Sequence, residues 1–551
     1  MSAAGKAMAS TDREAGSGMR MLPRAFQWTL CLVLLVCAVL YVAWTWRWPL
    51  LGDCTLFHYI AFLMDHGFAP YRDLPDMNLP GSFLVEWLVI HTYGGGSLAW
   101  RLFDFTVLAA MAVGLIVLAR PYDWFAGVFS AVIMVLVHGR DGIYDTGQRD
   151  LTIAALMVAG YVFLFRARRK NEAWAAGVFG FCMAAAGTIK PTTLLLMVIL
   201  LAFLVVAIRR EGGPAGRFLA WGIAGMILPL AIVWIFLLRE HAVGAFAASL
   251  TTLEPYFASL GHRPLSYLLV HSISPVMPLV ATWIALLIGS SLVNRSWREG
   301  RGVGSIEQWE RAALVIGMLV ALLGFIAQGK GFPYQRYSFL VLLLLLIALD
   351  LTAALRESGF RLWLAVLGLG FGCLFLVPQS LMKVKRYDWR NQQYTSMMDA
   401  DLERLGGSRL SGHVQCMDTT TGCSHAFYNL KLVSETGMLS DFLVFGPPQN
   451  PEVRGVRAQF LPQMEARPPW VMVVTGGLFP KGPTDFRKLK LWPAFDDFLS
   501  EHYRLCAQRT PTKMVDWGGG PPEPPASYRI YALDGDAQLA APCAELTAAG
   551  Q

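Results

Sequence analysis

The chain has 551 residues, of which 55% are hydrophobic and only 15% are charged, and its formal net charge at pH 7 is +7. Soluble domains have about 45–50% apolar and about 25% charged residues, and this composition also excludes disordered, collagen-like and disulfide-scaffold proteins. Apolar runs of about 18–20 residues recur along the first two-thirds of the chain, and each can cross about 30 Å of hydrocarbon as a helix. The sequence therefore predicts a polytopic α-helical membrane protein and excludes a purely soluble enzyme or a nucleic-acid-binding protein.

The N-terminal tail, residues 1–27, is polar and contains Arg13, Arg20 and Arg24. The apolar stretch 28–48 that follows is longer than the hydrophobic core of a signal peptide, and no clear cleavage site comes after it. We therefore expect a cytoplasmic N-terminal tail and a first span that acts as a signal anchor.

Hydrophobicity predicts about eleven spans, most of them joined by short loops. These are 28–49, 99–119, 123–138, 150–165, 173–189, 192–208, 218–238, 265–290, 311–327, 338–355 and 361–378. The stretch Gly81–Tyr93 is apolar but short and contains Glu86 and His91. It is expected to be either a re-entrant or juxtamembrane helix or a short span.

Basic residues gather in the loops on one side of these spans. That side carries the N-terminal tail, Arg120, the groups at 166–170, 209–217 and 295–311, and Arg356 with Arg361. The positive-inside rule places this side in the cytoplasm, so the region after the last span is expected outside.

The composition changes after Pro378, and residues 386–551 contain no apolar run of span length. Short β-rich runs at 413–417, 470–474 and 528–533 alternate with helical patterns. This alternation predicts a small extracytoplasmic α/β domain that follows a membrane domain of residues 28–385.

Four cysteines lie in this C-terminal region, and in an exported domain they allow three pairings. Since Cys416 and Cys423 flank one tight Thr/Gly turn, we favour Cys416–Cys423 together with Cys506–Cys543. The alternative is that all four are reduced and buried.

Charged residues at the outer ends of the spans are the candidate functional groups, because a charge at the membrane border is costly to hold in place. The first is Asp53, which precedes an amphipathic stretch expected to lie on the membrane surface and to end at Gly67. Asp53 is either the N-cap of this helix or a carboxylate that faces a cavity.

The second group is the loop 138–150, where carboxylates and arginines are dense. Asp150 opens the next span and is either a helix cap or a functional carboxylate. Arg149 either pairs with a neighbouring Asp, which is worth little at a surface, or binds an anion.

The third and fourth groups are basic. Lys190 lies between two apolar runs that are joined too tightly to place it in open water, so it either snorkels to the interface or binds an anion. The segment 328–337 contains Lys330 and Tyr334, and it fits either an anion-binding loop or a basic turn with interfacial tyrosines.

All four groups are predicted on the same face of the membrane. Cations suit a phosphate, whereas a carboxylate suits a general base or a metal ion. The combination points to a lipid phosphate bound at the membrane border, with chemistry on the group that the phosphate carries.

The order of these motifs resembles the GT-C class of membrane glycosyltransferases, in particular the branch of aminoarabinose transferases, protein O-mannosyltransferases and rhizobial-type lipid A sugar transferases. The resemblance covers about residues 28–350. It rests on Asp53 after the first span, a Pro-rich end of the first outer loop, an aromatic-Gly stretch that leads to Arg101, a second outer Asp (Asp150), Gly187 to Lys190, and Gly329-Lys330 with Tyr334.

The resemblance implies a polyprenyl-phosphate sugar donor that binds from the outer leaflet, and transfer with inversion to an acceptor outside, whether lipid A, another polysaccharide or a protein. It implies that Arg149, Lys190, Lys330 and Tyr334 bind the donor phosphate. Asp53 would take the acceptor proton, and Asp150 would position the acceptor or share a metal ion. The protein would then lie in a bacterial inner membrane with its C-terminal domain in the periplasm.

Three positions depart from the pattern of many relatives. Cys54 replaces a Glu, Leu151 replaces a Pro, and Asn78-Leu79-Pro80 replaces a Lys-Pro-Pro, so one phosphate contact is absent. A Mg²⁺ or Mn²⁺ ion would require several oxygen ligands, and Asp53 and Asp150 supply only two carboxylates, so the metal stays open.

Two other classes of protein fit the same charges. A transporter or flippase for a lipid-linked or anionic solute would bind phosphate without chemistry, although no internal repeat is visible. A scaffolding subunit of an envelope polysaccharide assembly would use the loops only for packing. Asp53→Asn and Asp150→Asn discriminate: an enzyme loses turnover but keeps donor binding, a carrier loses lipid movement, and a scaffold loses little.

Overall fold

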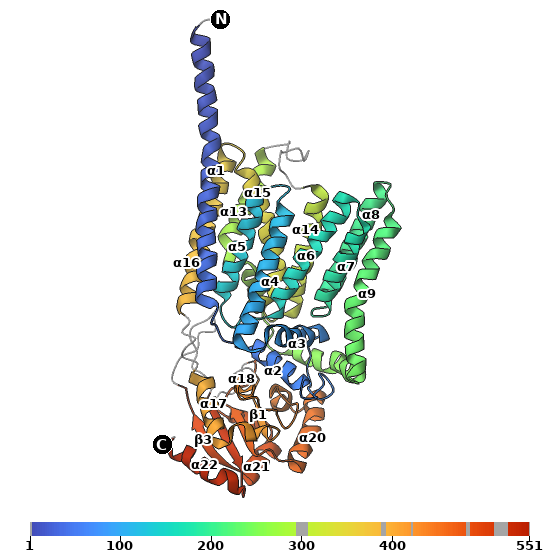
Figure 1. Cartoon of the computed structure of the whole chain (residues 1–551), viewed down its shortest axis with the longest axis vertical. Helices are drawn as coiled ribbons and strands as arrows, with labels where there is room; N and C mark the ends of the chain where they lie inside the picture. Colours follow the sequence, from blue (N-terminus) through green and yellow to red (C-terminus); the bar gives the residue numbers. More distant parts are fainter. Residues whose placement is uncertain are drawn as a thin grey trace.

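The computed structural model describes residues 3–293, 307–386, 393–419, 422–480, 485–511 and 527–549. A bundle of long helices forms one part of the molecule, and a small domain with a sheet lies at one end of it (Figure 1). The N-terminal helix projects from the opposite end of the bundle (Figure 1).

The bundle consists of helices that match the predicted spans. Their bounds are α1 (Ala3–Thr45), α4 (Gly96–Ala119), α5 (Trp124–Asp141), α6 (Arg149–Lys170), α7 (Ala173–Gly187), α8 (Thr192–Arg210), α9 (Ala215–Arg239), α12 (Leu265–Ile273) continued through a 3₁₀ turn (Ser274–Val276) into α13 (Met277–Val293), α14 (Gln308–Gln328), α15 (Tyr337–Ala354) and α16 (Phe360–Arg386). Within the described ranges, ten helices are long and apolar enough to cross a membrane, and α7 is a shorter apolar helix of 15 residues. The predicted polytopic helical fold is confirmed.

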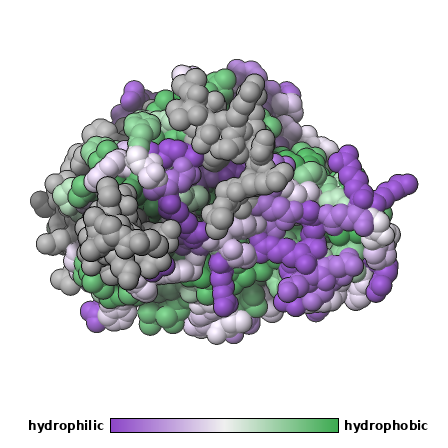
Figure 2. Space-filling model, turned by 90° about the horizontal axis from the view of Figure 1, so that it is seen from above, coloured by the Kyte–Doolittle hydropathy of each residue, from purple (hydrophilic) through white to green (hydrophobic). Residues whose placement is uncertain are grey.

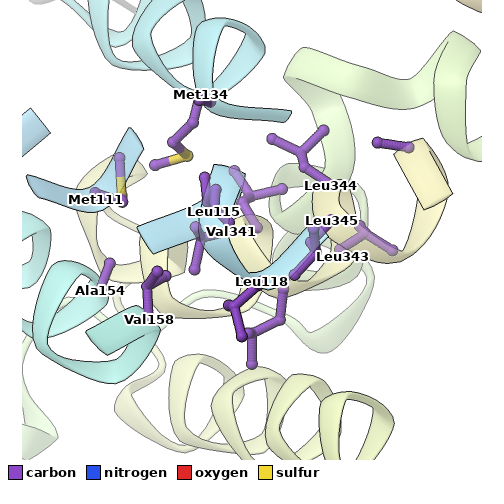
Figure 3. Packing of buried hydrophobic residues seen from close by; sticks show 14 of the residues in the cluster. Met111, Leu115, Leu118, Met134, Ala154, Val158, Val341, Leu343, Leu344 and Leu345 are labelled. Atoms are coloured by element: carbon purple, nitrogen blue, oxygen red, sulfur yellow. The ribbon is translucent and has the colours of Figure 1, made fainter. Parts of the chain in front are cut away.

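The centre of the bundle is α15, a Leu-rich helix that is hydrophobic on all sides. In its apolar window 89% of the residues are buried, against 17% for the peripheral α9. Figure 3 shows Val341, Leu343 and Leu344 of α15 within a cluster of side chains that also come from α4, α5 and α6. A helix that is apolar all round belongs in such a core, and the helices around it turn their outer faces to lipid.

Helix α9 is held to the bundle by close backbone contact with α7. A Cβ atom on Gly180 would lie 2.2 Å from the backbone oxygen of Gly222, and one on Gly225 would lie 1.8 Å from that of Gly177. Small residues at a helix interface permit this approach. The resulting van der Waals contact stabilises the helix pair, since lipid provides no hydrophobic effect between the helices.

The basic loops predicted to be cytoplasmic lie at the end from which α1 projects. Both α6 and α8 end there with basic residues in their last turns, and Figure 2, viewed from that end, shows hydrophilic side chains spread over one side of the face. The predicted group at 295–301 lies outside the described residues.

Short helices lie between the bundle and the sheet domain (Figure 1). They are α2 (Asp53–Met64), α3 (Pro80–Tyr93), α10 (Val243–Ala248), a π-helical turn (Ser249–Leu253) and α11 (Glu254–Ser259). Helix α3 begins with Pro80 and ends at Gly94 in the left-handed conformation, so its 14 residues extend about 21 Å. Helix α3 packs against α2 between the bundle and the sheet domain, so Gly81–Tyr93 does not run through the bundle as the long helices do.

The C-terminal domain contains a four-stranded sheet in the order β1-β2-β4-β3. Strand β1 (Val414–Met417) pairs in parallel with β2 (Val471–Thr475), and β4 (Tyr528–Leu533) pairs antiparallel with β2 and with β3 (Tyr503–Arg509). Its helices are α17 (Gln393–Leu405), α18 (Cys423–Asn429), α19 (Phe442–Phe445), α20 (Pro451–Ala466), α21 (Pro493–His502) and α22 (Ala537–Ala549), with 3₁₀ turns at Gly407–Leu410 and Arg487–Leu491. The predicted α/β fold is confirmed, and so is the favoured disulfide pairing, Cys416–Cys423 and Cys506–Cys543.

Candidate active site

Asp53 is the first residue of α2, at the end of the bundle that faces the C-terminal domain. The N-cap of this helix is Gly52, and no side-chain hydrogen bond caps the helix. Instead, the hydroxyl of Tyr334 donates a hydrogen bond of 3.2 Å to Oδ2 of Asp53. Tyr334 belongs to the 3₁₀ turn Pro333–Arg336 that leads into α15, so this contact joins two segments that are far apart in the sequence.

Asp150 and Lys190 form a second contact of the same kind. Asp150 lies in the first turn of α6, and Lys190 lies in the tight connection between α7 and α8. The ammonium of Lys190 donates to Oδ1 of Asp150, and both side chains are largely buried, at 19% and 10% exposure. Lys190 therefore faces a carboxylate of the protein.

Backbone contact with α3 fixes the connection that carries Lys190. The backbone N–H of Gly81 donates to the carbonyl oxygen of Thr188 over 3.0 Å. A Cβ atom on Gly81 would lie 2.2 Å from Oγ1 of Thr188, so only glycine permits this approach. The Pro-rich end of the first outer loop is thereby held against the α7–α8 connection.

Arg149 links the two contacts. Its guanidinium carbon lies 3.4 Å from the centre of the Phe57 ring on α2, which is a cation–π contact. Its charge also acts on Tyr334, which lies within electrostatic range of Asp53 and Asp150. Five of the six predicted site residues, Asp53, Arg149, Asp150, Lys190 and Tyr334, are thus brought into one group, which we call the outer site.

A cavity opens beside Lys190 between α6, α8, α14 and α15. One part of its lining is polar and the other is apolar. The polar residues are Lys190, Thr192, Thr193, Gln328, Gln335 and Ser338, and the apolar ones are Met157, Leu196, Val320, Ala321, Gly324 and Phe325. The ammonium of Lys190 therefore borders both polar and apolar side chains.

Lys330, the sixth predicted residue, is engaged elsewhere. Its ammonium donates to the backbone oxygens of Phe257 (2.7 Å), Ala258 (3.3 Å) and Leu260 at the end of α11. Burial lowers the pKa of this ammonium below its usual value. Lys330 thus fastens the 254–260 segment to the start of α15, and its role in phosphate binding stays a prediction.

Two features of the outer site were missed by our sequence reasoning. Asp76, in the loop before α3, lies within electrostatic range of both Asp53 and Arg149 and is 7% exposed. Asp141 forms a buried ion pair of 2.5 Å with Arg336, which belongs to the same 3₁₀ turn as Tyr334. The signal available for Asp76 was its place in a Pro- and Asp-rich loop, but the sequence offered no ground for choosing it over Asp73.

The carboxylates of the outer site are not arranged as a set of metal ligands. In the described parts of the chain, no group of three or more His, Cys, Asp or Glu side chains is arranged to hold a metal ion. The donors at the outer site, Asp53 and Asp150, each contact a cation or hydroxyl of the protein. The residues present therefore do not form a metal site, and we derive no step through one.

The chain is similar to known proteins in its structure and not in its sequence. No family model and no curated protein matches the sequence. The crystal structure of ArnT from Cupriavidus metallidurans bound to undecaprenyl phosphate matches with a TM-score of 0.58 at 12% identity, over 91% of this chain and 98% of that chain. The apo form of the same protein matches with a TM-score of 0.56 at 12% identity, over 94% and 98%.

The chain has the GT-C glycosyltransferase fold. This confirms the predicted fold. An oligosaccharyltransferase from Archaeoglobus fulgidus also matches, with a TM-score of 0.48 at 11% identity, over 81% of this chain and 69% of that chain. At such identities the likeness extends to the fold alone, so the roles of individual residues depend on their own geometry.

Proposed function

We propose that this protein is a membrane glycosyltransferase that moves a sugar from a polyprenyl-phosphate donor to an acceptor outside the cytoplasm. The observation that carries the proposal is the outer site itself, where two carboxylates, two cations and a tyrosine from four distant segments meet beside a cavity with a polar and an apolar part. An ArnT structure of the same fold was solved with undecaprenyl phosphate bound.

In this proposal the cavity beside Lys190 holds the donor. The phosphate binds at Lys190, where Thr192 and Gln335 add polar contacts, and the first prenyl units pack against Phe325 and Leu196. A buried ammonium attracts an anion much more strongly than an exposed one, because water screens its charge less.

Donor binding exchanges the partners within the outer site. Without donor, Lys190 pairs with Asp150, and Tyr334 donates to Asp53. A phosphate anion competes for the ammonium and the hydroxyl, since charge-assisted hydrogen bonds are the stronger ones. Asp53 is then free to accept a proton only when a donor is present, which suppresses reaction without it.

The reaction uses Asp53 as general base. The acceptor hydroxyl gives its proton to the Asp53 carboxylate as its oxygen bonds to the anomeric carbon, and the bond from that carbon to the phosphate oxygen breaks. The leaving group is polyprenyl phosphate, whose charge Lys190 and Arg149 stabilise. Attack opposite the leaving phosphate inverts the anomeric carbon, and Asp150 positions the acceptor.

The basic loops favour an inner-membrane location with the N-terminus in the cytoplasm and the outer site and C-terminal domain in the periplasm. The test compares the envelope glycans and lipid A, by mass spectrometry, of cells with and without the protein. We expect one sugar mass to disappear and to return with the wild-type chain but not with Asp53→Asn. Unchanged glycans would contradict a transferase, and full restoration by Asp53→Asn would indicate a scaffolding subunit instead.

A further inference from the structure

The 3₁₀ turn Pro333–Arg336 carries neighbouring side chains that face different parts of the molecule. A 3₁₀-helix has three residues per turn, so consecutive side chains leave its backbone about 120° apart. The hydroxyl of Tyr334 donates to Asp53 over 3.2 Å. The next residue, Gln335, lines the cavity that Lys190 also lines. This one turn therefore supplies a side chain to the outer site and another to the cavity beside it.

The last residue of the turn, Arg336, ties it to two other helices. Its side chain is 3% exposed, and that of Asp141, the last residue of α5, is 2% exposed. Nη2 of Arg336 donates to Oδ1 of Asp141 over 2.5 Å. Nη1 donates to the carbonyl oxygen of His271 on α12 over 2.5 Å and to Oγ of Ser274 over 3.4 Å. The two ends of one guanidinium thus join the turn to α5 and to α12.

The contact with His271 lies at a break between two helices. Helix α12 ends at Ile273, and the 3₁₀ turn Ser274–Val276 that follows contains Pro275, which has no backbone N–H. In a continuous helix the residue at this position would donate to the carbonyl oxygen of His271, so that oxygen lacks its usual backbone partner. Arg336 supplies a donor in its place. The guanidinium is therefore fixed by the backbone of this break as well as by a carboxylate.

The anchored arginine determines how the whole turn is oriented. The turn has only four residues, and α5, α6, α12 and α14 all contact it. Within so short a turn the side chains are fixed relative to one another, so a rotation that displaces Arg336 also displaces Tyr334 and Gln335. A misplacement of about 1 Å at a reacting group can cost about 10²-fold in rate. The contacts of Arg336 therefore reach the outer site through the backbone of the turn.

We propose that Arg336 is a positioning residue for the donor: it holds the turn in the orientation in which Tyr334 and Gln335 reach the lipid phosphate. This inference rests on the proposed function. A buried ion pair is weak evidence for stability, since apolar residues of similar volume often serve as well. What an arginine adds is a rigid fork that holds a carboxylate and a carbonyl oxygen at once, which the single ammonium of a lysine does not reproduce.

The experiment compares two lysine variants of the full-length protein in nanodiscs. Arg336→Lys keeps the charge and loses the fork. The matched control is Arg311→Lys, because Arg311 on α14 donates from both Nη atoms to Asp350, near the other end of α15. The measurements are equilibrium binding of undecaprenyl phosphate and the midpoint of thermal unfolding, each for wild type and for both variants.

Arg336→Lys should bind undecaprenyl phosphate about tenfold more weakly than wild type, because the hydrogen bonds from Tyr334 and Gln335 are each worth a few-fold in affinity. Arg311→Lys should bind as wild type does. Both substitutions should lower the unfolding midpoint, so lost stability alone does not account for a difference in binding. The inference is overturned if Arg336→Lys binds like wild type or if both variants lose affinity equally. A wild-type protein that binds no undecaprenyl phosphate would overturn the proposed function itself.

A double variant, Asp141→Leu with Arg336→Met, keeps the test decisive should Arg336→Lys fail to fold. Apolar residues often replace a buried ion pair without loss of stability, because no charge is then left unpaired. This protein should fold and still bind undecaprenyl phosphate about tenfold more weakly, since the turn has lost its anchor. Wild-type affinity in the double variant would show that the pair serves stability alone, and would overturn the inference.

Discussion

Two groups of charged side chains lie near the end of the bundle that faces the C-terminal domain, and they differ in their access to water. The outer site retains partial exposure: the side chains of Lys190 and Asp150 are 19% and 10% exposed. One layer deeper, Arg101 and Asp104 on α4 are each 1% exposed at their side chains.

The deeper group consists of buried residues that contact one another: Arg101, Asp104, His138, Tyr337 and Tyr41. We call it the Arg101 network. Arg101 lies 3.1 Å from Asp104, and Nε2 of His138 lies 3.3 Å from the same carboxylate. Since a carboxylate only accepts, Nε2 donates to Asp104, and Nδ1 of His138 forms a hydrogen bond of 3.0 Å with the hydroxyl of Tyr337. The guanidinium also contacts the Tyr41 hydroxyl on α1, so the network joins α1, α4, α5 and α15.

The comparison shows that a charge within a membrane bundle is not by itself a functional site. Intramembrane charges are functional candidates by default, but Arg101, Asp104 and His138 are buried and contact one another or Tyr41. The outer site instead consists of two pairs, Lys190 with Asp150 and Tyr334 with Asp53, and Lys190 lines a cavity from which a phosphate can reach its ammonium. The two groups therefore differ in whether a ligand can reach their charges, and both groups contain charges.

The largest expected effects come from removing one carboxylate in each group. Asp53→Asn should lower kcat by about 10²- to 10⁴-fold because it removes the general base, while the midpoint of thermal unfolding stays near that of wild type. Asp104→Asn leaves the Arg101 charge buried without its counter-ion, which should lower the free energy of unfolding by about 3–5 kcal/mol. Transfer assays and thermal unfolding in the same detergent measure both quantities.

The comparison fails if the two variants exchange their effects. A normal kcat for Asp53→Asn, or an Asp104→Asn protein that unfolds like wild type, would contradict the comparison. Access of a ligand to the charges would then not distinguish functional residues from structural ones.

The sequence predicted the spans well because about 20 consecutive apolar residues have few stable alternatives to a helix that crosses the bilayer. Even α7, with 15 residues, was predicted at its observed place. The convergence of Asp53, Asp150 and Lys190 was predictable as well, since alternating spans bring successive outer loops to one side. Their individual partners were not predictable from charge alone.

Contacts between distant loops are what the sequence could not predict. Lys330 was expected to bind phosphate, yet its nearest acceptors are carbonyl oxygens about 70 residues earlier in the chain. Asp76 was not singled out because its burial depends on Ser249 and on the C-terminal domain. No local pattern records either contact, as both arise from packing of the juxtamembrane segments.

A smaller effect should distinguish the two lysines. Lys190→Met removes the cation beside the cavity and should weaken binding of undecaprenyl phosphate by about 10- to 100-fold, since a hydrogen bond to a charged group is worth about 1.5–3 kcal/mol. Lys330→Met should mainly release the 254–260 segment, with faster proteolysis there and little change in lipid binding. Equilibrium binding and limited proteolysis provide the two measurements. Equal loss of lipid binding in both variants would return Lys330 to the phosphate site.

The smallest expected effect compares two tyrosines that lie three residues apart. Tyr334 donates to Asp53 in the outer site, and the hydroxyl of Tyr337 is hydrogen-bonded to Nδ1 of His138 in the Arg101 network. Tyr334→Phe should raise the KM for donor about fivefold at unchanged stability, because one hydrogen bond is worth about 1 kcal/mol. Tyr337→Phe leaves Nδ1 of His138 buried without a partner and should cost about 1–3 kcal/mol of stability at unchanged KM.

These two phenylalanine variants are the sharpest form of the comparison, since the same atom is removed from the same turn of the chain. If donor binding exchanges partners as proposed, undecaprenyl phosphate should increase the labelling of Asp53 by a carbodiimide in wild type, because the lipid phosphate draws the Tyr334 hydroxyl away from this carboxylate. Tyr334→Phe should label equally with and without the lipid, and Tyr337→Phe should behave as wild type. Equal labelling of wild type with and without the lipid would mean that Tyr334 does not control when Asp53 can act as the base.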